Sequence, residues 1–226
     1  MNDNPDHLGH RQRLRKRFLT SGPDALPDYE LLELLLFQAK PRSDVKPLAK
    51  RLIKHFGSFA SVLSASRARL TEVEGVGEAT VAAIKVAEAA ALRLSQGQLL
   101  NRPVLSSWQA LLDYCQAAMS HKDSELFRIL FLDRKNTLIA DEIQQSGTVG
   151  HAPVYPRGVV KRALELGASA VILIHNHPNG DPTPSEADIS ITEEIVAAGK
   201  SLSIAVHDHL IIGKGGHASF KSMGLL

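Results

Sequence analysis

The stretch that most constrains the fold is an apolar run that ends in a cluster of polar side chains. Residues 170–174 read AVILI, and HNHPNGDPTPSEAD follows at once, from His175 to Asp188. A short, continuous apolar run of this kind predicts a buried strand. Side chains alternate along a strand, so His175 and His177 are expected on the same side. The next helix would begin near Ser185, which leaves a proline-rich loop between the two elements.

This spacing predicts a metal site. The loop can fold Asp188, in the first turn of the helix, back beside the two histidines. Two imidazoles and one carboxylate make up the three-ligand set of a catalytic zinc site, whose fourth position is left to water. A thiolate-rich structural site is excluded, because Cys115 is the one cysteine of the chain. The expected cofactor is therefore one Zn²⁺ ion, although other divalent metals also bind imidazole and carboxylate ligands.

Composition limits the class of protein further. Of the 226 residues, 44% are hydrophobic, which is enough for a buried core. No apolar run approaches the ~18 residues of a membrane span. The N-terminal stretch is polar and basic and does not read as a secretory signal. A single cysteine allows no disulfide framework, which is typical of a reducing compartment. We therefore expect a cytoplasmic protein without membrane contact.

The hydrophobic pattern divides the chain into two parts. Helical spacing prevails up to residue 97, and no strand pattern occurs before residue 100. The segment 98–103 reads as a linker. After it, the expected order of elements is α, β, β, α, β, α, β, β. The predicted fold is of mixed α+β class, with a basic arm and an all-α domain at residues 1–97 and an α/β domain at residues 104–226.

The segment from His175 to Asp188 resembles the JAMM motif of MPN-domain metalloproteases. The stretches LFLDRKN, VYPRGVVKRALELGASAVILIHNHPNGDPTPSEADI and DHLIIGKGG are similar to the bacterial RadC family, also called UPF0758. The resemblance implies a small helical domain followed by an α/β MPN (JAMM, cytidine-deaminase-like) domain. It also implies that His175, His177 and Asp188 ligate the metal and that Ser185 stabilises charge on the substrate carbonyl. A plain helix N-cap is the alternative role for Ser185.

The motif itself contains no general base, and two glutamates are candidates. Glu125 starts the predicted strand ELFRILFLD, and Glu142 ends the predicted strand NTLIADE. A hairpin turn centred between Arg134 and Lys135 would place Glu142 opposite Phe127, and both glutamates would then point the same way. Geometry therefore leaves both open. The resemblance favours Glu125, because MPN metalloproteases carry their glutamate just before the apolar run of the first strand.

The segment LTEVEGVGEATVAAIKVAEAA resembles a helix-hairpin-helix motif, with its turn at Gly75, Val76 and Gly77. Such a turn exposes backbone N–H groups that can hold a DNA phosphate without reading sequence. Residues 1–97 also carry a small basic excess, with 15 Lys and Arg against 11 Asp and Glu. Glu74 and Glu78 flank the turn and oppose phosphate binding, so a structural or protein-binding turn stays open.

His207 and His209 form a second His-X-His pattern, in the stretch VHDHLIIG. No Ser-X-X-Asp follows them. We interpret both as structural side chains, with a hydrogen bond to a metal ligand as the alternative.

These patterns together predict a zinc-dependent metallohydrolase that cleaves peptide or isopeptide bonds in a protein or peptide substrate. The alternative is a DNA-associated repair or recombination protein, in contact with DNA through residues 1–97, whose metal site acts on or near nucleic acid. The intact ligand set argues against an inactive MPN scaffold. A homodimer is also compatible with the sequence.

Overall fold

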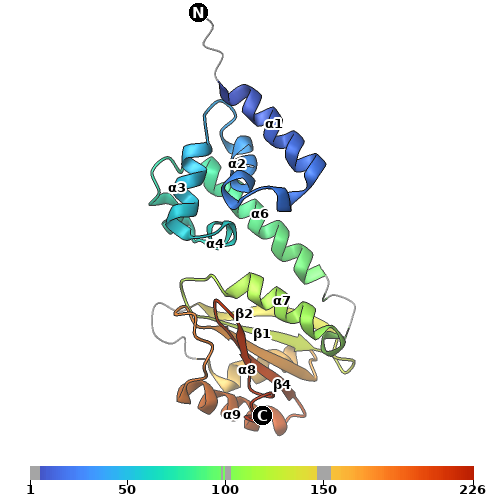
Figure 1. Ribbon diagram of the computed structural model, residues 1–226. Coiled ribbons are helices and arrows are strands. Elements are labelled where there is room, and N and C mark those ends of the chain that lie inside the picture. Colours follow the sequence, from blue (N-terminus) through green and yellow to red (C-terminus); the bar gives the residue numbers. More distant parts are fainter. Residues whose placement is uncertain (1–5, 98, 100–102, 147–153) are drawn as a thin grey trace, which may run out of the picture. The chain divides into compact units, whose positions relative to one another are not determined.

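The computed structural model describes residues 6–97, 99, 103–146 and 154–226. The chain divides into two compact units, Met1–Ala91 and Leu92–Leu226 (Figure 1). The division lies inside a continuous helix, α6 (Glu78–Gly97). Most of the predicted linker 98–103 lies outside the described residues, so that boundary stays a prediction.

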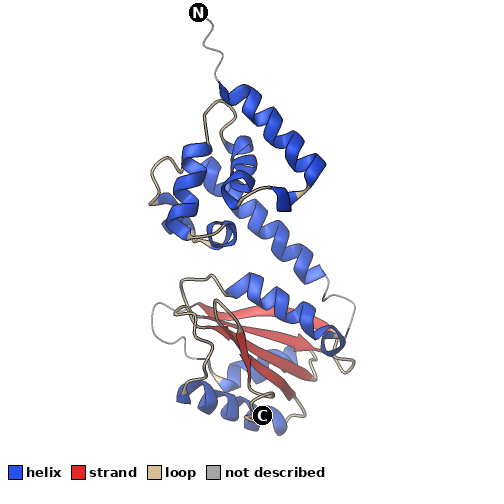
Figure 2. Ribbon diagram, in the orientation of Figure 1, coloured by secondary structure: helices blue, strands red, loops and turns tan. Residues whose placement is uncertain are grey.

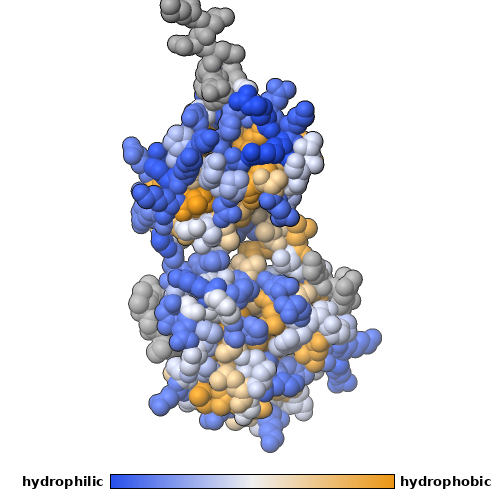
Figure 3. Space-filling model, in the orientation of Figure 1, coloured by the Kyte–Doolittle hydropathy of each residue, from blue (hydrophilic) through white to orange (hydrophobic). Residues whose placement is uncertain are grey.

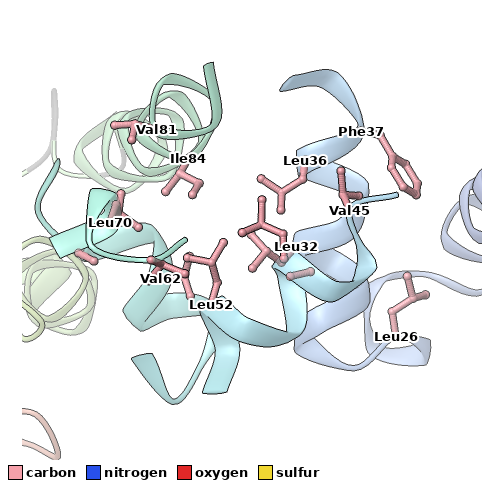
Figure 4. Packing of buried hydrophobic residues seen from close by; sticks show 14 of the residues in the cluster. Leu26, Leu32, Leu36, Phe37, Val45, Leu52, Val62, Leu70, Val81 and Ile84 are labelled. Carbon is pink, nitrogen blue, oxygen red and sulfur yellow. The ribbon is translucent and has the colours of Figure 1, made fainter. Parts of the chain in front are cut away.

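The described residues of the first unit form helices joined by turns and loops, without strands. After α1 (Asp6–Ser21) a single 3₁₀ turn, η1 (Pro23–Ala25), leads into the helices that form the core. These are α2 (Asp28–Ala39), α3 (Lys46–Phe56), α4 (Phe59–Ser64), α5 (Arg67–Thr71) and α6. Gly57 ends α3 with a positive φ of 94°, and Ser58 then caps α4. Buried aliphatic side chains pack between the helices (Figure 4), among them Leu32, Leu36, Leu52, Val62, Leu70 and Ile84.

The second unit is a mixed β-sheet with helices on both faces. It opens with η2 (Val104–Ser107) and α7 (Trp108–Met119) and continues with the hairpin β1 (Leu126–Leu132) and β2 (Leu138–Ser146). Then follow α8 (Pro156–Glu165), β3 (Ala170–Asn176), α9 (Glu186–Lys200), β4 (Ala205–Ile212) and β5 (His217–Ser219). Apart from the 3₁₀ turn, this is the predicted order of helices and strands.

Strand β3 is central to the sheet. Over the described residues, the strands lie in the order β2-β1-β3-β4-β5. Only the β3–β4 pair among them is parallel, and every residue of β3 is buried. Helix α7 covers one face, and helices α8 and α9 cover the other (Figure 2). The continuous apolar run that predicted β3 is therefore explained by burial on both faces.

The register of the hairpin differs from the predicted one. Two irregularities, after Phe127 and after Phe131, shift the pairing of β1 with β2. Glu142 consequently lies opposite Ile129, and Gln145 lies opposite Phe127. The prediction that Glu142 faces Phe127 was wrong for two reasons. The turn is centred at Lys135, because Leu132 pairs with Leu138, and the hairpin contains bulges that a regular register leaves out.

The surface does not suggest a membrane-embedded segment among the described helices. None of these helices combines the length and the apolar character that crossing a bilayer requires. The face seen in Figure 3 is largely hydrophilic, with apolar residues in scattered patches.

We expect Ile172→Ala to destabilise the second unit by about 2–5 kcal/mol, because Ile172 is fully buried on β3 and a cavity would remain. The matched control is Ile143→Ala on β2, where the side chain is 50% exposed and the loss should stay near 0.5–1 kcal/mol. Denaturant unfolding followed by circular dichroism compares the two. Equal losses would contradict the assignment of β3 as the central, doubly covered strand.

Candidate metal centre

Three side chains meet where β3 ends and α9 begins. His175 is the buried penultimate residue of β3, His177 follows the strand, and Asp188 lies in the first turn of α9. His175 Nε2 lies 3.0 Å from His177 Nε2 and 3.1 Å from Asp188 Oδ1. His177 Nε2 lies 3.5 Å from Asp188 Oδ2. Ligand atoms of a tetrahedral zinc ion are about 3.3–3.4 Å apart, given zinc–ligand distances of about 2.0–2.1 Å. The three predicted ligands are therefore brought together at the separation that a shared ion requires.

The orientation of the His177 ring directs the lone pair of its Nε2 toward the space between the three candidate ligands. Its Nδ1 lies 2.7 Å from the backbone carbonyl oxygen of Asp181. A carbonyl oxygen can only accept, so Nδ1 carries the proton and donates it. In a neutral imidazole the other nitrogen, Nε2, is then unprotonated. An unprotonated Nε2 directed at a second imidazole nitrogen and a carboxylate suits a bound cation, so the donor set fits a metal ion.

The third candidate ligand, Asp188, is ordered by the start of α9. Its Oδ2 accepts hydrogen bonds from the backbone N–H of Ser185 at 2.8 Å and from the Ser185 hydroxyl at 2.6 Å. The Ser185 Oγ in turn accepts from the Asp188 N–H at 3.2 Å, which completes a capping box. Partial burial raises the pKa of Asp188, but the neighbouring His175 and His177 and the hydrogen bond from Ser185 outweigh it and hold that pKa well below its usual range. Asp188 is thus ionised at neutral pH.

Ser185 occupies the N-cap position that was the alternative to a catalytic role. Its only hydroxyl proton is directed at Asp188 Oδ2 in this structure. The predicted role at the substrate carbonyl stays a prediction, because it requires that proton to turn toward a substrate.

The loop between the histidines and α9 is held by short-range contacts. Asp181 N–H donates to Asn179, and the Asp181 carboxylate accepts from the N–H and hydroxyl of Thr183. Gly180 has a positive φ of 93° and bonds through its carbonyl to Lys214. A Cβ at Gly213 would collide with that same carbonyl, so glycine is required there. The loop therefore presents the Asp181 carbonyl to His177 in a fixed position.

Glu125 immediately precedes β1, and His177 immediately follows β3. The pairing of these two strands runs as far as Phe127 and His175, which are two residues from Glu125 and His177 respectively. The charge of Glu125 also contributes to raising the pKa of His177, behind the larger effect of the Asp188 hydrogen bond. The structure thus puts Glu125 beside the candidate ligands, while its role as the base stays a prediction.

Asn176, between the two histidines, fixes the backbone around Glu125. Its side-chain oxygen accepts from the Leu126 N–H at 2.9 Å, and its side-chain NH₂ donates to the Ser124 carbonyl at 3.1 Å. These two groups belong to the peptide bonds on either side of Glu125. Sequence reasoning missed Asn176, although its place between two candidate ligands on a buried strand was a usable signal.

The other candidate base, Glu142, is engaged elsewhere. Its carboxylate receives three hydrogen bonds from the guanidinium of Arg162 on α8, at 2.6–3.1 Å. The Arg162 hydrogen bonds lower the pKa of Glu142. A carboxylate held in this way is a weak base.

The second His-X-His pattern splits into two different environments. His209 is buried, and its Nε2 lies 2.8 Å from His175 Nδ1. His207 instead bonds through Nε2 to Asn136 at 2.6 Å. The register of β3 with β4 shifts at this point, which makes His207 an extra residue opposite no partner. For His209 the interpretation as a purely structural side chain was incomplete. His209 hydrogen-bonds the candidate ligand His175, which is the alternative role stated for it.

Gly75, Val76 and Gly77 lie in the turn between α5 and α6 of the helical unit. Gly75 has a positive φ of 91°, and the Val76 N–H donates to the Val73 carbonyl at 3.1 Å. Arg51 donates to the Glu74 carbonyl at 3.2 Å, next to Gly75. The turn joins two helices, as predicted, whereas the helix-hairpin-helix assignment and DNA contact at the turn stay predictions.

We expect His177→Ala to abolish metal binding and leave the protein folded, because His177 lies after the strand and outside the hydrophobic cores. Metal content after dialysis and circular dichroism measure the two effects. His207→Ala is the matched control: it removes an imidazole from the same unit and should retain the metal. Global unfolding of His177→Ala would indicate a structural metal, and full retention would remove His177 from the ligand set.

Comparisons with known proteins agree with this geometry. Residues 105–225 match the family model described as a RadC-like JAB domain, and residues 6–82 match the UPF0758 N-terminal model. A UPF0758 protein of Rhodobacter capsulatus is 66% identical over 213 residues, which cover 94% of this chain and 100% of the relative. The UPF0758 protein SPO0054 of Ruegeria pomeroyi is 58% identical over 217 residues, 96% of this chain and 97% of the relative.

A JAB domain with two histidines and an aspartate at its candidate metal site fits the metal-dependent hydrolase kind. The site lies inside the matched JAB segment, and the helical unit carries the UPF0758 N-terminal match. The chain therefore belongs to the UPF0758 family of proteins with a RadC-like JAB domain.

Proposed function

We propose that the protein is a zinc-dependent metallohydrolase that cleaves peptide or isopeptide bonds. The observation that carries this proposal is the convergence of His175 Nε2, His177 Nε2 and the Asp188 carboxylate, with Glu125 close enough for its charge to act on His177. Three protein ligands leave one coordination position for a reacting group, which is typical of catalytic zinc sites.

The candidate ligands favour a zinc site built from imidazole and carboxylate groups over a thiolate-rich metal site. Two imidazoles and a carboxylate suit zinc, although other divalent ions bind the same groups. Cys115 is a buried residue of α7 and its burial raises the pKa of its thiol, so it supplies no thiolate to the site. When bound, zinc would act as a Lewis acid that polarises a scissile carbonyl and makes a nearby water molecule more acidic.

The residues of this chain would divide the remaining work. Glu125 would take the proton of the attacking water and return it to the leaving amine. Asn176 would keep the Glu125 backbone in place through its bonds to Ser124 and Leu126. Ser185 would turn its hydroxyl from Asp188 toward the developing negative charge on the substrate carbonyl.

Zinc-loaded full-length protein incubated with a peptide library and with isopeptide-linked peptides tests the proposal. We expect cleavage that stops after chelation and returns when zinc is restored. Protein with stoichiometric zinc that cleaves neither substrate class would contradict the peptidase assignment.

The base is tested by a pair of variants with the same chemical change. Glu125→Gln should keep zinc and lose hydrolysis on the order of 10²–10⁴-fold, because a proton acceptor is removed and no ligand is lost. Glu142→Gln should retain most of the activity, since Glu142 pairs with Arg162. Initial rates and zinc content are measured for both. An active Glu125→Gln beside an inactive Glu142→Gln would reverse the two assignments.

DNA contact is a second proposal, supported by one arginine. The Arg51 side chain is exposed and its guanidinium lies beside Gly75, so it adds positive charge next to the turn's backbone N–H groups. Part of the basic arm serves the fold instead. Arg11 donates to the carbonyls of Lys40 and Ser43, and Arg17 pairs with Glu30.

If the turn binds DNA, Arg51→Ala should weaken binding of a DNA duplex at low salt and reduce the salt slope by about 1, because one phosphate contact is lost. Fluorescence anisotropy of the full-length protein across salt concentrations measures both quantities. Arg157→Ala, which removes an exposed arginine from α8, is the charge-matched control. Absence of binding by the wild type at about 50 mM salt would end this proposal.

A further inference from the structure

A chain of buried hydrogen bonds runs from helix α9 to the candidate ligand His175. The Thr192 hydroxyl lies 2.5 Å from the backbone carbonyl oxygen of Asp188 and 2.6 Å from His209 Nδ1. The other nitrogen of that ring, His209 Nε2, lies 2.8 Å from His175 Nδ1. Thr192, His209 and His175 have 1%, 0% and 1% of their surface exposed, so water does not compete for these bonds.

The direction of each bond follows from its end at Asp188. A backbone carbonyl only accepts, so the single hydroxyl proton of Thr192 is donated to it. The Thr192 oxygen can then only accept from His209, which must carry its proton on Nδ1. The Nε2 of a neutral His209 is consequently an acceptor, and His175 must donate to it from Nδ1. The proton of His175 is thereby held on the nitrogen that faces away from the metal centre.

His209 is kept neutral by its surroundings, as this direction requires. Its ring packs 4.7 Å from the ring of Phe220 and 5.6 Å from that of Phe127. His209 is fully buried, and its two ring nitrogens contact Thr192 and His175 rather than a carboxylate. A positive charge on this ring would therefore be buried without a counter-ion hydrogen-bonded to it, which is strongly unfavourable.

We propose that Thr192 and His209 are positioning residues that fix His175 in the tautomer whose Nε2 is free to bind a metal. This inference rests on the metal centre of the proposed function and concerns residues outside the ligand set. Thr192 lies one helical turn after Asp188, so the helix that supplies one ligand also sets the protonation of another. Groups that orient metal-bound histidines in this way typically contribute 10–100-fold to metal affinity.

Long-range ¹H–¹⁵N spectra of the metal-free, ¹⁵N-histidine-labelled wild type at pH 8 test the proposal directly. These spectra report which ring nitrogen carries the proton, and the readout depends on neither metal nor activity. We expect His175 and His209 in the Nδ1–H form. His177, whose Nδ1 donates to Asp181, serves as an internal reference. A His175 found in the Nε2–H form would overturn the proposal.

Two variants of Thr192 separate a hydrogen-bonding role from a packing role. Thr192→Val keeps the side-chain shape and removes the hydroxyl, so His209 is expected to turn its proton to Nε2 and His175 to shift toward the Nε2–H form. Zinc affinity, measured by competition with a chromophoric chelator, should fall 10–100-fold. Thr192→Ser restores the hydroxyl and should bind zinc like the wild type. Wild-type affinity in Thr192→Val, or an equal loss in both variants, would contradict the proposal.

Thermal unfolding of both variants shows whether they fold. If Thr192→Val does not fold, the proposal is still tested by the tautomer of His175 in the wild type and by the zinc affinity of Thr192→Ser. The outcome is independent of the hydrolase proposal: a wild type with the expected tautomers and zinc affinity that cleaves no substrate would contradict the proposed reaction alone. A wild type that binds no zinc would contradict the metal centre on which both proposals rest.

Discussion

The candidate metal centre of the second unit brings together the lone pairs of His175 Nε2, His177 Nε2 and the Asp188 carboxylate, with no proton between them. His177 donates its ring proton to the Asp181 carbonyl, and the Asp188 carboxylate is ionised. Nitrogen and oxygen acceptors about 3 Å apart repel each other, so this arrangement is unfavourable until a cation is present. The surrounding structure compensates through the fully buried strand β3, the braced loop at residues 178–184 and the capped start of α9. Local conflict supported by a rigid framework is typical of a functional site.

Much of this site could be predicted from the sequence because its ligands lie within one short segment. The apolar run before His175, the proline-rich loop and the Ser-X-X-Asp helix start each have a direct structural meaning. The order of helices and strands in the second unit followed from hydrophobic periodicity for the same reason. Local patterns were sufficient wherever the determining contacts were also local.

The parts that could not be predicted depend on contacts between distant segments. His209 reaches His175 because β4 pairs in parallel with β3, and Thr192 reaches His209 from the helix between them. The spacing of Asp188 and Thr192 by four residues marks one helix face, but nothing in the sequence indicates which strand that face meets. The irregularity after Phe131 that helps to place Glu142 opposite Ile129 likewise leaves no clear sequence signal.

The capping box of α9 divides the two oxygens of one carboxylate between two tasks. Asp188 Oδ2 holds the helix end through Ser185, while Oδ1 is turned toward His175. A side chain that is already immobilised by its own helix has little rotational freedom left to lose when an ion arrives. Metal binding at this centre would therefore be governed by electrostatic attraction and dehydration of the ion more than by ordering of the protein. The start of α9 holds Asp188 preorganised for the ion before it binds.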